Sequence, residues 1–252
     1  MTTEGANTLK VRLVIPICDR NAIREGYRCE ESSNIEERFN LLKDIFKVSY
    51  KKENENYPDL IVTSNNFLDY TNSKDKKTLY HILKEVENEL QQNLNSPKVK
   101  HLILGFDIPP HLNLSNGIPA VVSYWKFEDY WNLDTSILET WNVKNCDMQN
   151  FCKQNTKRVI NINSFKITIL SCGDIQKYCH CNGLLIPDCD VIIDLAHLNY
   201  GLGKRVPYDK YTQSFLEYFN SWEEKPNLAI LITTQVTDFK KKIILISQAI
   251  VV

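Results

Sequence analysis

Short apolar segments alternate with amphipathic helices in the first hundred residues, and this order constrains the fold more than any other feature. Apolar runs at 9–18, 59–63 and 99–106 have the length of buried strands. Between them, residues 34–52 and 74–93 carry apolar side chains at helical spacing, and Pro58 and Pro97 follow the two helical patterns. This order predicts an α/β layered protein in which the three strands share one sheet and both helices cover one face.

The remainder of the chain is predicted to be mostly strands. Strands are expected at 117–127, at 190–195, at 228–234, at 243–252, and in one or two segments within 158–171 joined near Asn163. A helix is expected at 208–222, mainly loops at 129–155, and a turn at 238–241. Because no repeat or long linker divides the sequence, residues 1–252 are expected to form a single domain.

Composition excludes several functional classes. The net charge is −1 and no basic stripe carries interleaved aromatic residues, so no nucleic-acid partner is expected. No apolar stretch is long enough to cross a bilayer, so no membrane partner is expected. The eight cysteines follow a start that lacks the features of a signal peptide, which predicts reduced thiols and a cytoplasmic location.

The segment at 165–174 carries the clearest chemical signal. An alternating, β-branched run ends abruptly at Cys172, which is followed by Gly173 and Asp174. A cysteine at a strand-to-helix turn is rigidly placed yet reachable, and the amides of the turn can stabilise negative charge. The alternative is a small apolar residue that ends a buried strand, since free cysteine is often buried. The segment alone leaves both interpretations open.

Several segments together resemble the nitrilase superfamily of carbon–nitrogen hydrolases. The run 167–174 resembles the family's cysteine strand, and 189–194 is similar to the strand after it. The stretch from Tyr124 to Lys126 is similar to the family's lysine motif. Residues 116–122, 101–105 and 227–234 resemble further strands in the same order. The resemblance spans nearly the whole chain, and its specificity comes from the order and spacing of motifs that are individually weak.

This resemblance implies an αββα sandwich and a Glu–Lys–Cys triad in which each residue follows a strand. Cys172 would be the nucleophile and Lys126 the lysine. Asn65 stands at the position of the family's glutamate, and an amide cannot accept a proton at useful pH. Asp69 lies nearby in the sequence. Gly173 also replaces a larger residue, and the segment between Gly105 and Lys126 is short for the family.

The resemblance also implies a mechanism. The Cys172 thiolate would attack an amide or nitrile carbon and form a covalent intermediate that water then hydrolyses. Lys126 would stabilise the developing negative charge together with a backbone amide near Gly173, and would lower the cysteine pKa. Asp174 and His197 are further candidate binding residues, although Asp174 could simply begin a helix and His197 could be a hydrogen-bonded core residue.

A zinc site is the alternative for the same segment. Five thiolate or imidazole ligands fall within eighteen residues: Cys172, Cys179, His180, Cys181 and Cys189. The spacing around His180 is not that of a zinc knuckle, and a structural zinc would occupy Cys172. Reduced cysteines following a strand are therefore the preferred interpretation, and we expect no metal and no cofactor.

Two functional classes remain open from the sequence. The first is a cysteine hydrolase that acts on the C–N bond of a small-molecule or peptide amide, which Cys172 and Lys126 favour. The second is a catalytically degenerate module that binds a ligand or a protein, which Asn65 favours. The very apolar tail at 243–252 predicts a homodimer or a tail that packs as a strand.

Overall fold

A computed structural model of the chain describes residues 8–19, 35–51, 57–65, 67–70, 78–95, 97–109, 112, 120–138, 156–171, 174, 178, 186–195, 229–233, 236–238 and 244–251. Beyond residue 195 it describes the backbone alone. No helix in these ranges is long and apolar enough to cross a membrane.

The larger sheet is mixed and contains eight strands. Its main path runs through β11 (Val236–Asp238), β1 (Leu9–Asp19), β2 (Leu60–Thr63), β4 (His101–Asp107), β5 (Ala120–Phe127) and β6 (Trp131–Leu138). β1, β2 and β4 are parallel neighbours, which confirms that the three predicted strands share a sheet. The two-residue β3 (Leu68–Asp69) pairs with the end of β4, and β12 (Ile244–Val251) runs antiparallel to β1.

The smaller sheet has four strands in the order β10 (Ala229–Thr233), β9 (Val191–Leu195), β8 (Phe165–Ser171) and β7 (Val159–Ile162). β8, β9 and β10 are parallel, so β8 and β9 end at the same edge. β7 and β8 form the predicted hairpin. Asn163 lies in its turn with a φ of 54°, a left-handed conformation that asparagine tolerates better than most residues.

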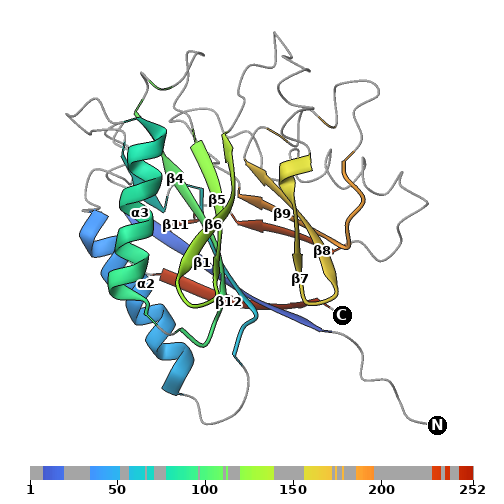
Figure 1. The fold of residues 1–252 in the computed structure, drawn as a ribbon. Helices are drawn as coiled ribbons and strands as arrows, with labels where there is room; N and C mark the ends of the chain where they lie inside the picture. The colour runs from blue at the N-terminus through green and yellow to red at the C-terminus, as the bar shows by residue number, and fades with distance from the viewer. Residues whose placement is uncertain are drawn as a thin grey trace.

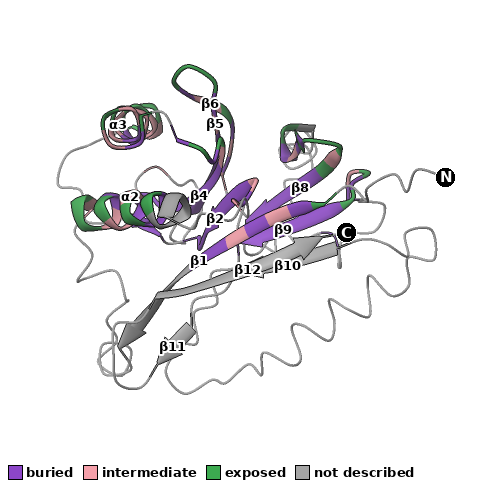
Figure 2. Ribbon diagram, turned by 90° about the horizontal axis from the view of Figure 1, so that it is seen from below, coloured by how far each residue is buried: buried purple, intermediate pink, exposed green. Residues whose placement is uncertain are grey.

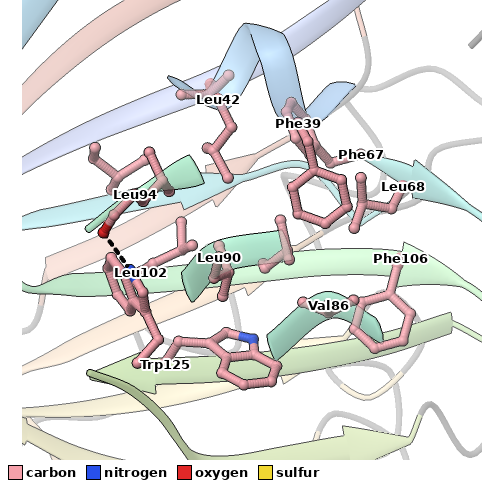
Figure 3. Close-up of a cluster of buried hydrophobic side chains, with 14 of the residues drawn as sticks. Phe39, Leu42, Phe67, Leu68, Val86, Leu90, Leu94, Leu102, Phe106 and Trp125 are labelled. Atoms are coloured by element: carbon pink, nitrogen blue, oxygen red, sulfur yellow. Dashed lines mark hydrogen bonds between the residues drawn. The ribbon is translucent and has the colours of Figure 1, made fainter. Parts of the chain in front are cut away.

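Two helices cover one face of the larger sheet: α2 (Ile35–Lys51) and α3 (Leu79–Asn93) (Figure 1). Their apolar stripes pack on the sheet around Leu102 and Trp125, in the cluster drawn in Figure 3. The outer sides of both helices are exposed (Figure 2). Thr78 caps α3 by accepting a hydrogen bond from the His81 amide, so this helix begins at Leu79, five residues later than the predicted start at Lys74.

A second apolar core lies between the two sheets. It is built from inward-facing residues such as Val62, Ile103, Ile169 and Ile193. The molecule therefore stacks helices, a sheet and a second sheet (Figures 1 and 2), consistent with the predicted αββα order. The helix predicted at 208–222 lies outside the described residues, and the single-domain organisation stays a prediction.

Three expectations for the later segments have different outcomes. The prediction of loops at 129–155 is wrong for β6, in which buried Trp131 and Ile137 alternate with more exposed polar residues. Because its polar residues interrupt the apolar pattern, the sequence of β6 resembles that of a loop. The predicted turn at 238 begins one residue too early, because Asp238 ends β11. The apolar tail packs as β12, whereas dimerisation stays a prediction.

Candidate active site

The parallel strands of both sheets end on the same side of the sandwich, which we call the rim. Asn65 lies two residues beyond the end of β2 and is fully buried. Its Nδ2 donates a hydrogen bond to Ser171 Oγ at 3.3 Å, and Ser171 is the last residue of β8. Asn65, which the sequence resemblance assigns to the position of the family's glutamate, therefore lies against the residue that directly precedes Cys172.

A glycine makes this placement of Asn65 possible. A Cβ at Gly105 of β4 would lie 2.4 Å from the Ser64 carbonyl oxygen and 2.5 Å from Asn65 Cα. Contacts this short do not occur, so only glycine allows the chain after β2 to cross β4 so closely. The Gly105 amide also donates to Thr63 Oγ1 at 3.0 Å, which ties the end of β2 to the same point.

Asp174 fixes the turn that follows β8. Its Oδ2 accepts the Ser171 amide at 3.0 Å and Arg158 Nη1 at 2.6 Å. Both side chains of the Arg158–Asp174 ion pair are 0% exposed. Asp174 was predicted to bind ligand or to begin a helix. It forms a buried ion pair and accepts the Ser171 amide, so it links the described residues on either side of Cys172 and Gly173 in the sequence.

Lys126 does not lie at the rim, which contradicts the prediction that it meets Cys172. It pairs in register with His101, the first residue of β4, and His101 pairs with Leu60, the first residue of β2. The length of β2 alone, about 10 Å, separates that level from the rim. Lys126 is 45% exposed, and its Nζ binds Glu128 Oε1 at 2.7 Å. This ion pair raises the pKa of Lys126.

The reason for this error is the missed strand β6. The predicted lysine motif lies in β5, which is antiparallel to β4 and so leads away from the rim. β6 returns: its last residue, Leu138, pairs with Val121, which in turn pairs with Phe106. The last residue of β6 therefore lies at the rim end of the sheet. The first lysine after Leu138 is Lys144, which lies outside the described residues.

Several predicted site residues lie outside the described part of the chain: Cys172, Gly173 and His197. The same is true of the candidate zinc ligands other than Cys189. Cys189 is a buried thiol whose pKa is raised by burial. The residues that the structure describes contain no group of three or more His, Cys, Asp or Glu side chains that could hold a metal ion.

Asp107 is a rim carboxylate that the sequence analysis missed. It ends β4 and is fully buried. Alternation along the strand places it on the same face as Ile103 and Gly105, which is the face turned toward the smaller sheet. It also pairs in register with Asp69, the acid noted beside Asn65 in the sequence. The sequence signal that could have identified Asp107 is a carboxylate directly after a predicted strand.

Comparison with known proteins identifies the fold. No protein-family model matches this sequence, and no curated protein matches it. Solved structures do match. A carbon–nitrogen hydrolase from Helicobacter pylori G27 superposes with a TM-score of 0.55 at 10% identity, covering 91% of this chain and 74% of that chain. An amidase from Nesterenkonia sp. gives a TM-score of 0.51 at 7% identity, covering 94% and 79%.

A glutamine-dependent NAD+ synthetase from Acinetobacter baumannii also matches, with a TM-score of 0.52 at 13% identity over 97% of this chain and 41% of that chain. Another matching structure, a mutant of the Nesterenkonia sp. AN1 amidase, is described as a member of the nitrilase superfamily. The chain therefore has the nitrilase-superfamily fold, as its sequence motifs predicted.

Proposed function

We propose that this chain is a cysteine-dependent carbon–nitrogen hydrolase that acts on the amide bond of a small molecule or peptide, with Cys172 as nucleophile. The observation that carries the proposal is the Asn65–Ser171 hydrogen bond at the rim. It supports a site in which the chain after β2 and the turn after β8 face one another. Two Nesterenkonia amidase structures carry covalent adducts at an active-site cysteine, one from fluoroacetamide and one from acrylamide.

The proposed reaction proceeds by acyl transfer to sulfur. The Cys172 thiolate adds to the carbonyl carbon, and backbone amides of the turn stabilise the oxyanion. The C–N bond then breaks, the nitrogen leaves with a proton as the amine, and the acyl group remains as a thioester. Water adds to the thioester, the C–S bond breaks, and the acid and the thiol are regenerated.

This reaction needs a base, and Asn65 cannot supply one. We assign that role to Asp107, whose buried carboxylate ends β4 on the face turned toward the smaller sheet. Gly105, two residues earlier on that face, is the point at which Asn65 crosses β4. In this proposal the stabilising lysine comes from the segment after Leu138, and Lys144 is its first candidate.

Amide hydrolysis by purified protein tests the proposal. Release of ammonia from a panel of simple amides is expected from the native chain and from Cys189→Ala, and is expected to be lost in Cys172→Ala and Asp107→Asn. Cys189→Ala is the matched control, because it removes a buried thiol of the same sheet. Activity that persists in Cys172→Ala would refute the hydrolase.

A second candidate, a catalytically degenerate ligand-binding module, is favoured by Asn65 itself. Its buried Oδ1 has no hydrogen-bond partner among the described residues, so a ligand N–H could bind there. In this case simple amides raise the melting temperature of the native chain without being hydrolysed. Hydrolysis that appears only in Asn65→Glu would select this candidate, since that change restores a carboxylate at the family's position.

A further inference from the structure

We propose that Arg158 is a positioning residue that holds the Cys172 turn in its reactive geometry through Asp174. The inference rests on the proposed function of Cys172. One carboxylate oxygen of Asp174 receives two donors, the Ser171 amide at 3.0 Å and Arg158 Nη1 at 2.6 Å. The Ser171 bond closes a loop of four residues, and Cys172 and Gly173 are the two residues inside it.

Arg158 is itself held by the opposite sheet. It ends the 3-10 helix η3 (Thr156–Arg158), which leads directly into β7. Thr135 Oγ1 of β6 donates a hydrogen bond to the Lys157 carbonyl at 2.9 Å. A continuous chain of contacts therefore runs from the larger sheet through η3 and Arg158 to Asp174 and Ser171 at the end of β8.

Stability alone does not explain a charged pair at this position. An ion pair in the core loses the hydration of both charges, and well-packed apolar residues of similar size often hold a fold equally well. Asp174 Oδ1 also has no hydrogen-bond partner among the described residues. What the pair provides, and apolar packing does not, is a directional bond from a fixed carboxylate to the Ser171 amide.

An exposed ion pair elsewhere in the described residues provides the comparison for Arg158–Asp174. Lys166–Asp188 joins residues near the starts of β8 and β9, with side chains 56% and 70% exposed. It lies on the same sheet as the turn but at the opposite end of the strands. Lys166→Met is therefore a matched control for a change at Arg158.

The test separates positioning from folding with the double variant Arg158→Met/Asp174→Leu. Because both charges are removed together, the fold is expected to keep near-native stability in urea. The readout is the rate of iodoacetamide alkylation of each cysteine, followed by peptide mass spectrometry. Buried Cys189 reports on opening of the same sheet.

We expect the Cys172 rate to fall about tenfold in the double variant, since small displacements of a reacting group carry penalties of this size. The Cys189 rate should stay unchanged. Arg158→Lys keeps the charge but not the planar geometry and should give a smaller loss, while Lys166→Met should change neither rate.

Three results would overturn the proposal. The first is a native Cys172 rate in the folded double variant. The second is faster alkylation of both cysteines in the double variant and in Arg158→Lys, because the pair would then support the fold and not the turn. The third is an equal loss in Lys166→Met. The proposed function fails separately, if native Cys172 is no more reactive than the other thiols and Cys172→Ala has no effect on amide hydrolysis.

Discussion

Polar side chains are exposed at one end of the sandwich and buried at the other. At the end where β4 and β8 begin, charged side chains reach solvent, as in the Lys126–Glu128 and Lys166–Asp188 pairs. At the rim, where these strands finish, an asparagine and two aspartates are fully buried: Asn65, Asp107 and Asp174. The sheets are continuous between the two ends, so the difference is local.

The rim also leaves polar atoms without partners among the described residues. Asn65 Oδ1 and Asp174 Oδ1 are buried and unpaired there. At the opposite end Tyr124 bonds His101 Nδ1 at 2.8 Å. An unpaired buried polar atom costs about 1–3 kcal/mol, so the rim is the less stable end. Such a cost is typical of sites that bind or react.

Breaking the buried rim pair should have the largest effect. Arg158→Met leaves the Asp174 charge buried and unpaired, so we expect it to lower the free energy of unfolding by about 3–5 kcal/mol. Lys166→Met removes one charge from the exposed pair and should cost under about 1 kcal/mol. Urea denaturation of the two variants measures both values. Equal losses would mean that the two ends do not differ energetically.

Filling the space at Gly105 should disturb the rim without touching a charge. Gly105→Ala places a methyl group against the Ser64 and Asn65 backbone, and overpacking of this kind costs about 1–3 kcal/mol. The shift of Asn65 should also slow Cys172 alkylation, with Cys189 as the internal reference. Native stability together with a native Cys172 rate would contradict the close approach at β4.

The sequence predicted those strands that can be recognised from the residues within a single segment. Apolar strands buried on both faces, such as β2 and β4, are legible because nearly every residue is apolar. Asn65 became a candidate site residue through the family resemblance, in which each site residue follows a strand, and its side chain bonds the last residue of β8. β6 was missed because its polar residues face solvent in alternation with buried ones.

The error in Lys126 came from that missed strand. Strand direction decides which end of a sheet a residue occupies, and without β6 the reversal after Phe127 was not recognised. Arg158 was not identified from the sequence either, since its partner Asp174 is sixteen residues away and the antiparallel pairing of β7 with β8 brings the two together. The order of the motifs predicted the fold. The make-up of the site depends on strand direction and on contacts between residues that are far apart in the sequence.

Tyr70 and Tyr124, two of the buried tyrosines in the described residues, should sharpen the comparison under alkaline conditions. Burial raises the pKa of both Tyr70 and Tyr124 above 10.0, so the folded chain retains protons that the unfolded chain loses. The stability they contribute is complete below pH 10.0 and is lost as the pH rises above it. Unfolding followed from pH 7 to 11 should show this loss, and Tyr70→Phe should reduce it.

At neutral pH, removing the hydroxyl group from Tyr70 or from Tyr124 should change the stability of the fold by different amounts. Tyr70→Phe removes a buried hydroxyl that has no partner in the described residues, so it should leave stability unchanged or raise it by up to about 1–3 kcal/mol. Tyr124→Phe removes the bond to His101 and should cost about 0.5–1.5 kcal/mol. Urea denaturation at pH 7 checks both variants. A larger loss from Tyr70→Phe would show that its hydroxyl has a partner.

The smallest effect is expected from Lys126→Ala, and it tests whether this lysine belongs to the rim at all. Amide hydrolysis and Cys172 alkylation should both stay native, because Lys126 lies in β5 opposite the first residue of β4, at the end of the sheet away from the rim. The change should appear at His101, whose pKa is lowered below 6.5 by burial and then by Lys126. Removing the cation should move that pKa upward. Because a lowered histidine pKa makes stability fall as the pH drops through 6.5, the variant should also lose less stability in mild acid. Histidine NMR titration measures the shift, and Glu128→Gln is the control that keeps the lysine. A lower rate of Cys172 alkylation in Lys126→Ala would show that this lysine acts at the active site. The contrast between the two ends would then fail.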